Sequence, residues 1–117
     1  MPVTGTKQKP VDIDHLAAYT GGDAGLNAEI LSLFRDQSAA MIGRLHHVLE
    51  AGDQKVWRET NHALKGAARG IGAFELAAAA DNAEPVAVSA DAAADALHAL
   101  EARMRAVHLF IDAYLGG

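Results

Sequence analysis

Residues 55–73 read KVWRETNHALKGAARGIGA, and this stretch decides how the rest of the chain is interpreted. Plotted as a helix at 100° per residue, it has an apolar face and a polar face. The predicted apolar face consists of Val56, Thr60, Ala63, Leu64, Ala67 and Ile71, with Trp57 at its margin. His62 points the opposite way, and around it lie Lys55, Arg58, Lys65, Gly66 and Arg69, with Glu59 at the edge. The pattern therefore predicts a helix that packs into a core on one side and holds His62 in solvent.

Gly66 is unexpected inside such a helix. An interior glycine costs roughly 1 kcal/mol relative to alanine, and the chain uses alanine at 26 other positions. One turn after His62, Gly66 leaves open space beside the imidazole for a bulky group or for another protein's backbone. Lys65 could reach the same space with its ammonium. An exposed imidazole with open space and a nearby cation suits transient phosphorylation of a histidine nitrogen.

These residues resemble the signature of histidine-containing phosphotransfer (HPt) domains. That family consists of helical bundles that relay a phosphoryl group between aspartates of receiver domains in phosphorelays. The motif comprises HALKGAA at 62–68, IGA at 71–73 and Leu76. Supporting positions are Gly22-Asp23, Leu31 to Phe34 and Gly52-Asp53, so the resemblance covers roughly residues 11–115. The chain departs from the family at Ala67 and Ala68, where many members carry one or two serines.

The resemblance implies roles for five side chains. His62 would be the phosphoacceptor, reacting through Nε2 with the aspartyl phosphate of a receiver domain. Lys65 would offset phosphate charge with Arg69 as a candidate helper, and Gly66 would provide steric clearance. Glu84 matches a position where the family often has a polar side chain, which makes it a candidate partner for Nδ1 of His62. An ordinary solvated carboxylate at a helix end is the alternative interpretation of Glu84.

The resemblance also implies the partners. The chain is expected to exchange phosphoryl groups with response-regulator receiver domains, including the receiver domain of a hybrid histidine kinase. The receiver would dock around His62, on the first helix, the middle of the second helix and the histidine helix, and would supply the magnesium. No cofactor or metal of the chain's own is expected. Since the sequence has neither a GxxxxGK loop nor a kinase-type glycine box, we interpret the chain as a phosphocarrier rather than a free-standing kinase.

Composition limits the classes of fold and function to which the chain can belong. The 117 residues suffice for one domain. A net charge of −5 argues against binding to nucleic acid or anionic membranes. The absence of cysteine excludes disulfides and fits the cytoplasm. No stretch has the roughly 20 apolar residues that span a bilayer, and residues 1–10 lack the apolar core of a signal peptide. These features, with polar outer helix faces, predict a soluble cytoplasmic monomer.

Hydrophobic periodicity predicts an all-α fold: an antiparallel up-down four-helix bundle with a short additional N-terminal helix. It forms one domain over residues 11–117, after a disordered lead-in at residues 1–10. The expected helices are 12–20, 23–50, a histidine helix that Asp53 caps and that the break from Gly70 to Gly72 ends, 73–83 and 90–115. Asp23 and Asp53 are expected N-caps. A hairpin about residues 51–52 would place His62 level with Met41, where Gln37, Ser38, Ala40 and Arg44 could flank it.

Two other functions fit a helical bundle. A non-catalytic adaptor would dock a kinase or receiver domain without phosphotransfer, and the alanines at 67 and 68 slightly favour it. A metal- or cofactor-binding bundle would need inward-facing His and Glu pairs three residues apart, and the sequence offers no such set. Of the remaining histidines, two are adjacent and two are ten residues apart, which is poor spacing for ligands, and His15 lies near the first helix. We assign all five to surface or core-margin roles. They are His15, His46, His47, His98 and His108.

Overall fold

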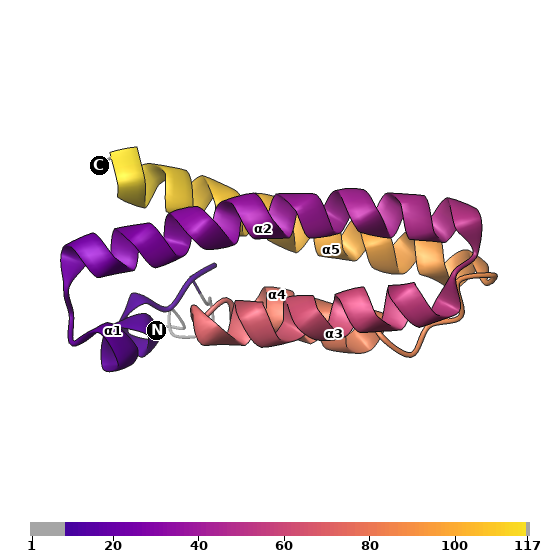
Figure 1. Cartoon of the computed structure of the whole chain (residues 1–117), viewed down its shortest axis with the longest axis horizontal. Coiled ribbons are helices and arrows are strands. Elements are labelled where there is room, and N and C mark those ends of the chain that lie inside the picture. The colour runs from indigo at the N-terminus through magenta and orange to yellow at the C-terminus, as the bar shows by residue number, and fades with distance from the viewer. Residues whose placement is uncertain (1–8, 117) are drawn as a thin grey trace, which may run out of the picture.

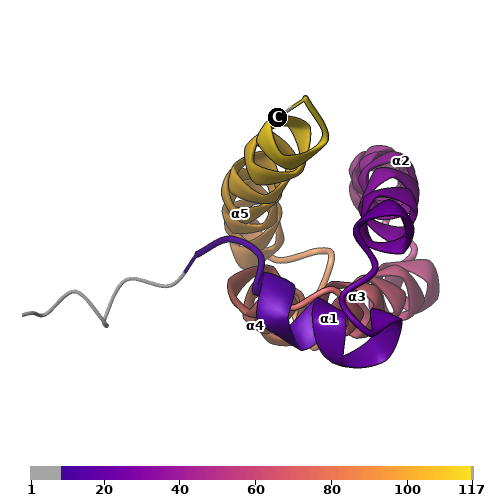
Figure 2. The same ribbon diagram turned by 90° about the vertical axis from the view of Figure 1, so that its left-hand side faces the viewer.

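The computed structural model describes residues 9–116, which form five helices and no strand (Figure 1). These are α1 (Ile13–Thr20), α2 (Ala24–Ala51), α3 (Gln54–Gly70), α4 (Phe74–Ala83) and α5 (Asp91–Gly116). Helices α2 to α5 alternate in direction and pack in a ring, while α1 lies across one end of the bundle (Figure 2). The predicted all-α bundle with a short leading helix is thus confirmed. Most of the predicted lead-in, residues 1–8, lies outside the described residues.

Aspartates begin the first three helices. The side chains of Asp12, Asp23 and Asp53 each accept a hydrogen bond from the backbone N–H three residues later, at 3.2, 2.9 and 3.1 Å. The predicted caps at Asp23 and Asp53 are therefore confirmed. These bonds satisfy amide groups that have no partner inside the helix, which typically contributes about 1 kcal/mol each.

Gly72 fixes α1 against the turn between α3 and α4. The backbone N–H of Asp12 donates to the carbonyl of Gly72 at 3.0 Å. A Cβ atom on Gly72 would lie 2.6 Å from the carbonyl oxygen of Asp12, and its φ of +80° also favours glycine. This close approach holds the N-terminal segment beside the end of α3, and Val11 is fully buried there.

The core runs along the inside of the ring of helices. Burying a large apolar side chain stabilises a fold by about 1.5–3 kcal/mol. Small residues let α4 and α5 approach closely, since Ala77, Ala80, Ala83 and Ala93 are buried. The largest fully buried side chains of α2 to α5 include Leu31, Leu45, Trp57, Leu64, Leu76, Leu97, Leu100 and Ile111.

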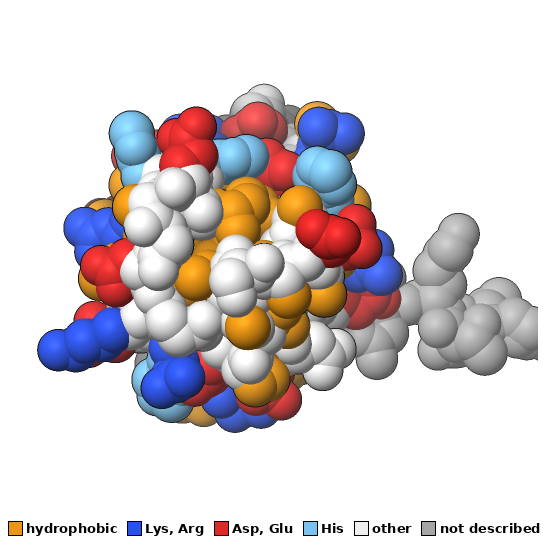
Figure 3. Space-filling model, turned by 90° about the vertical axis from the view of Figure 1, so that its right-hand side faces the viewer, with side chains coloured by type: hydrophobic (Ala, Val, Ile, Leu, Met, Phe, Trp, Pro, Cys, Tyr) orange, Lys and Arg blue, Asp and Glu red, His pale blue; other side chains and the backbone are white. Residues whose placement is uncertain are grey.

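The end of the bundle opposite α1 is closed by the α2–α3 and α4–α5 connections. Apolar side chains gather at its centre, with charged side chains and histidines around them (Figure 3). Gln54, the first residue of α3, anchors the longer connection: its side chain donates to the carbonyl of Val86 at 3.1 Å and accepts from the N–H of Val88 at 2.8 Å. The start of α3 is thereby tied to the connection between α4 and α5.

Two details differ from the sequence-based expectation. The buried face of α3 is rotated, because Asn61 is fully buried whereas Ala63 is exposed. The cause is that α3 packs against both α2 and α4, so the buried arc is not centred on its most apolar residues. Ser38, expected to flank His62, is fully buried and shares a 2.8 Å hydrogen bond with Nε2 of His108. It faces α5 rather than α3.

Within residues 9–116, no helix is both long enough and apolar enough to cross a membrane.

Candidate functional site

His62 projects from the middle of α3 into solvent. Its side chain is 68% exposed, whereas Asn61 and Leu64 on either side of it along the helix are fully buried. The predicted outward orientation of His62 is therefore confirmed. The ring belongs to a helix held in the core by its neighbours, so its position is rigid while its edge remains accessible.

Glu84 lies beside the ring. Its Oε1 is 3.4 Å from Nδ1 of His62, and it directly follows the last residue of α4. Burial alone would raise the pKa of the Glu84 carboxyl, but hydrogen bonds from Lys65 and His62 outweigh that effect and lower the pKa below its ordinary value. An ionised carboxylate can only accept. The contact therefore favours the tautomer with the proton on Nδ1 and a lone pair on Nε2.

Lys65 joins the same cluster from the next turn of α3. Its Nζ lies 3.0 Å from Oδ1 of Asp81 and 3.3 Å from Oε1 of Glu84. Hydrogen bonds to Asp81, and then to Glu84, raise the pKa of the Lys65 ammonium. The Lys65 side chain is only 17% exposed. In this structure Lys65 is therefore engaged with two carboxylates of the α4 end, rather than free beside the imidazole.

Asp81 was missing from the predicted site. The sequence did carry a signal for it, because Asp81 precedes Glu84 by three residues and so shares its face of α4. Predicting the contact with Lys65 requires knowing how α4 is rotated about its own axis relative to α3. Helical periodicity within each segment does not give that rotation.

The other two predicted site residues leave the surface around His62 open. A Cβ atom on Gly66 would meet no heavy atom within 4 Å apart from its own neighbours in the chain and helix. Arg69 is exposed in the last turn of α3, and no hydrogen bond or ion pair of its side chain occurs among residues 9–116. The structure thus brings His62, Lys65 and Glu84 together, places Gly66 beside open space, and leaves Arg69 at the rim.

The surface also has a shallow apolar groove of about 260 Å³. It lies between α1, α2 and α3 and reaches α3 at Ala67, directly after Gly66. Two of its side chains are well exposed, Tyr19 at 73% and Leu33 at 57%. The groove is lined by Leu16, Tyr19, Ile30, Leu33, Phe34, Gln37, Ala67, Gly70 and Ile71.

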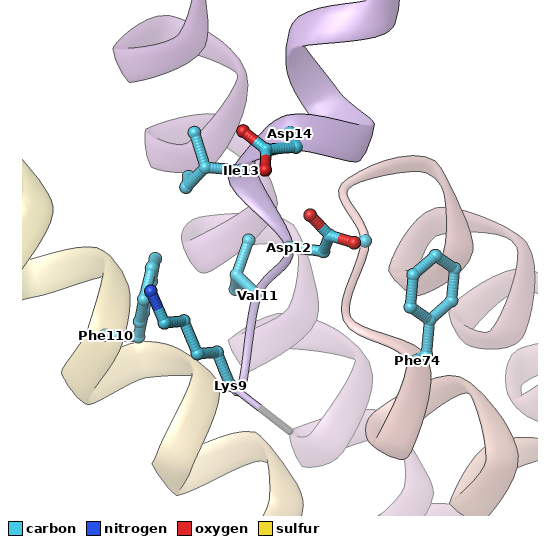
Figure 4. A pocket seen from close by; sticks show the side chains of 8 residues that line it. Lys9, Val11, Asp12, Ile13, Asp14, Phe74 and Phe110 are labelled. Carbon is cyan, nitrogen blue, oxygen red and sulfur yellow. The ribbon is translucent and has the colours of Figure 1, made fainter. Parts of the chain in front are cut away.

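A larger cavity of about 560 Å³ lies at the α1 end of the bundle (Figure 4). Lys9 and Phe110 lie together on one side of it, and Asp12 and Phe74 lie on the other. None of the predicted site residues lines it. Within residues 9–116, no group of three or more His, Asp and Glu side chains is placed to hold a metal ion.

The sequence profile of the Hpt domain matches residues 29–113, which is well over half of the chain and includes the whole cluster around His62. The chain belongs to the Hpt domain family. Histidine phosphotransfer in a phosphorelay is accordingly the function of this Hpt domain, and receiver domains of response regulators are its class of partner.

The fold of this Hpt domain is also found in a solved relative. The crystal structure of histidine-containing phosphotransfer protein B (HptB) from Pseudomonas aeruginosa PAO1 superposes with a TM-score of 0.85. The two chains are 23% identical, and the match covers 94% of this chain and 97% of the other. The likeness includes α1, which the profile match leaves out. A comparison with curated protein sequences gave no significant match.

Proposed function

We propose that His62 is the phosphoacceptor of this Hpt domain. It takes a phosphoryl group from the aspartyl phosphate of one receiver domain and passes it to the aspartate of another. The observation that carries this proposal is the 68% exposed side chain of His62, whose Nδ1 lies 3.4 Å from Oε1 of Glu84 while Nε2 has no hydrogen-bond partner among residues 9–116. By contrast, Nε2 of His46 pairs with Glu101 at 2.9 Å, and Nε2 of His108 bonds with buried Ser38 at 2.8 Å.

In the proposed step, the lone pair of Nε2 attacks phosphorus in line with the leaving carboxylate. The N–P bond forms as the P–O bond breaks, and the electron pair of the P–O bond leaves with the aspartate of the receiver. The imidazole acquires positive charge while its proton stays on Nδ1. Glu84, whose carboxylate faces that nitrogen, offsets the charge. The reverse step loads the second receiver.

The surrounding residues suit the new phosphoryl group. It carries up to two negative charges near neutral pH, which Lys65 is placed to offset once it turns toward Nε2, with exposed Arg69 at the rim. Gly66 gives the group and the approaching receiver room, since no side chain occupies that space. The receiver would bring its own magnesium, and the Hpt domain would need no cofactor.

The receiver is proposed to dock on the groove between α1, α2 and α3, which reaches α3 at Ala67, the residue after Gly66. Exposed Tyr19 and Leu33 offer apolar contacts. Exposed Arg58 and Arg69 would attract the acidic pocket of a receiver and speed encounter. Such a transient contact is expected to be modest in area. The receiver of a hybrid histidine kinase is one proposed partner, and the Hpt domain would act as a cytoplasmic monomer without nucleic-acid or membrane partners.

The test uses a receiver domain that carries a radiolabelled aspartyl phosphate. Mixed with the Hpt domain, it should yield labelled Hpt domain whose label is labile in acid and stable in base, as expected for phosphohistidine. His62→Ala should remain folded and gain no label. Binding of the phosphorylated receiver with no transfer to the wild-type protein would instead favour the adaptor alternative.

A further inference from the structure

The ammonium of Lys65 and Nδ1 of His62 contact the same carboxylate oxygen. One oxygen, Oε1 of Glu84, is 3.4 Å from Nδ1 and 3.3 Å from Nζ of Lys65. Nδ1 and Nε2 lie on different edges of the ring, and the proposed phosphoryl group is attached at Nε2. Contact of Lys65 with that group would therefore compete with its present contacts to Asp81 and Glu84.

The shorter of the two contacts of Lys65 is to Asp81, at 3.0 Å. Unlike Glu84, Asp81 has no hydrogen bond with His62 in the described part of the chain. Its carboxylate, which is 54% exposed, is placed to act on Lys65 alone. Asp81 lies in α4 and Glu84 directly follows that helix, so both carboxylates attract Lys65 toward the end of α4.

We infer that Asp81 is a positioning residue that restrains Lys65 in the unphosphorylated protein and thereby disfavours the phosphorylated state of His62. This inference rests on the proposed function. Its physical basis is charge. Lys65, Asp81 and Glu84 carry +1, −1 and −1, which sum to −1, and the phosphoryl group adds further negative charge beside them. Turning Lys65 toward the phosphoryl group also leaves Asp81 without its cation.

The exposure of Asp81 determines how strongly it should shift the equilibrium between phosphorylated and unphosphorylated His62. Ion pairs between exposed groups are weak because water and salt screen them. A pair of this kind corresponds to roughly a two- to fivefold change in an equilibrium. A shift of this size lowers the fraction of phosphorylated protein at a given phosphodonor concentration without preventing phosphorylation.

The experiment uses phosphoramidate as a small phosphodonor, because it replaces the receiver and removes docking from the comparison. Nε2 displaces ammonia from phosphorus, and intact-mass measurement gives the ratio of phosphorylated to unphosphorylated protein at steady state. Asp81→Asn should raise this ratio roughly two- to fivefold. Asp81→Glu, which retains a carboxylate within reach of Lys65, should restore the wild-type ratio.

Asp95→Asn is the matched control. It removes the same charge from an exposed position on α5, and no hydrogen bond or ion pair of Asp95 occurs among residues 9–116. The effect of Asp81→Asn should also shrink at about 1 M salt, where the Debye length is about 3 Å. A merely structural role of Asp81 would not be screened in this way.

The outcomes distinguish a wrong role for Asp81 from a wrong function for His62. If the wild-type protein is phosphorylated but Asp81→Asn matches Asp95→Asn, or is phosphorylated less than the wild type, the role of Asp81 is wrong and the proposed function stands. If neither phosphoramidate nor a phosphorylated receiver modifies the wild-type protein, the proposed function fails and the inference fails with it.

Discussion

The indole N–H of Trp57 donates a 2.9 Å hydrogen bond to the backbone carbonyl of Ala83, the residue before Glu84. Both residues are buried, so the bond joins α3 to the end of α4 inside the core. His62 lies about one and a half turns after Trp57 on the same helix. The distance between His62 and Glu84 is therefore set by a core contact as well as by their own interaction.

Trp57→Phe tests this link. Phenylalanine keeps an aromatic ring in the core but cannot donate, so the carbonyl of Ala83 loses a buried partner. We expect the free energy of unfolding to fall by about 1–3 kcal/mol in urea titrations. Tyr19→Phe, which removes a polar group from a 73% exposed ring, should change it by less than about 0.5 kcal/mol. Equal effects of the two substitutions would show that the hydrogen bond is unimportant.

Glu84 is expected to support transfer through both its hydrogen bond and its charge. Glu84→Gln keeps an oxygen that can accept from Nδ1, whereas Glu84→Leu removes both features. The single-turnover rate of transfer from a phosphorylated receiver should fall about tenfold in Glu84→Leu and less in Glu84→Gln. Glu50→Gln, at the exposed end of α2, serves as the charge control. Wild-type rates in Glu84→Leu would remove Glu84 from the mechanism.

Gly66→Gln tests the need for open space beside the imidazole. No heavy atom would obstruct the new Cβ, so the variant should fold, with a stability up to about 1 kcal/mol higher. Its side chain would occupy the space for the phosphoryl group, and phosphorylation by phosphoramidate should fall at least about tenfold. Gly43→Gln, at an equally unobstructed helical position in α2, is the matched control. Normal phosphorylation of Gly66→Gln would refute the argument from clearance.

His108 should make stability depend on pH. Burial lowers its pKa, and the nearby charges of Asp112 and Arg35 act in opposite directions. The folded protein then binds the proton less readily than the unfolded chain. The contribution of neutral His108 to the free energy of unfolding is fully present above the ordinary pKa of 6.5. It is lost as the pH falls from there toward the lowered pKa of the folded state.

Unfolding of His108→Gln across this pH range provides the check. The substitution should flatten the decline of the free energy of unfolding with acid, because the titrating group is gone. His98→Gln, at an exposed position on α5, should leave the decline unchanged. A His108→Gln variant that loses stability with acid as steeply as the wild type would contradict this assignment.

Features that depend on local sequence could be predicted. Asp23 and Asp53 cap helices through bonds to residues three positions away, and Gly52 ends α2 in the left-handed conformation. The exposure of His62 follows from its angle relative to the apolar residues of one helix. The bundle itself follows from five amphipathic helical segments that are joined by short connections.

Features that depend on how helices rotate against one another could not be predicted. Asn61 looks like a surface residue, yet it is fully buried, and its side chain donates to the carbonyl of Trp57 at 3.1 Å. Its Oδ1 has no partner among residues 9–116. The hydrogen bond of Ser38 with His108 and the contact of Asp81 with Lys65 each join two different helices, and the sequence does not show which faces of the helices lie against each other.

The central claim is that Nε2 of His62 carries the phosphoryl group, and NMR of the phosphorylated, nitrogen-labelled protein tests it most directly. Correlations between the ring protons and ring nitrogens identify both the histidine and the nitrogen that is modified. The account predicts a single phosphorylated ring, His62, modified at Nε2. A phosphoryl group on Nδ1 of His62, or on any other histidine, would contradict it.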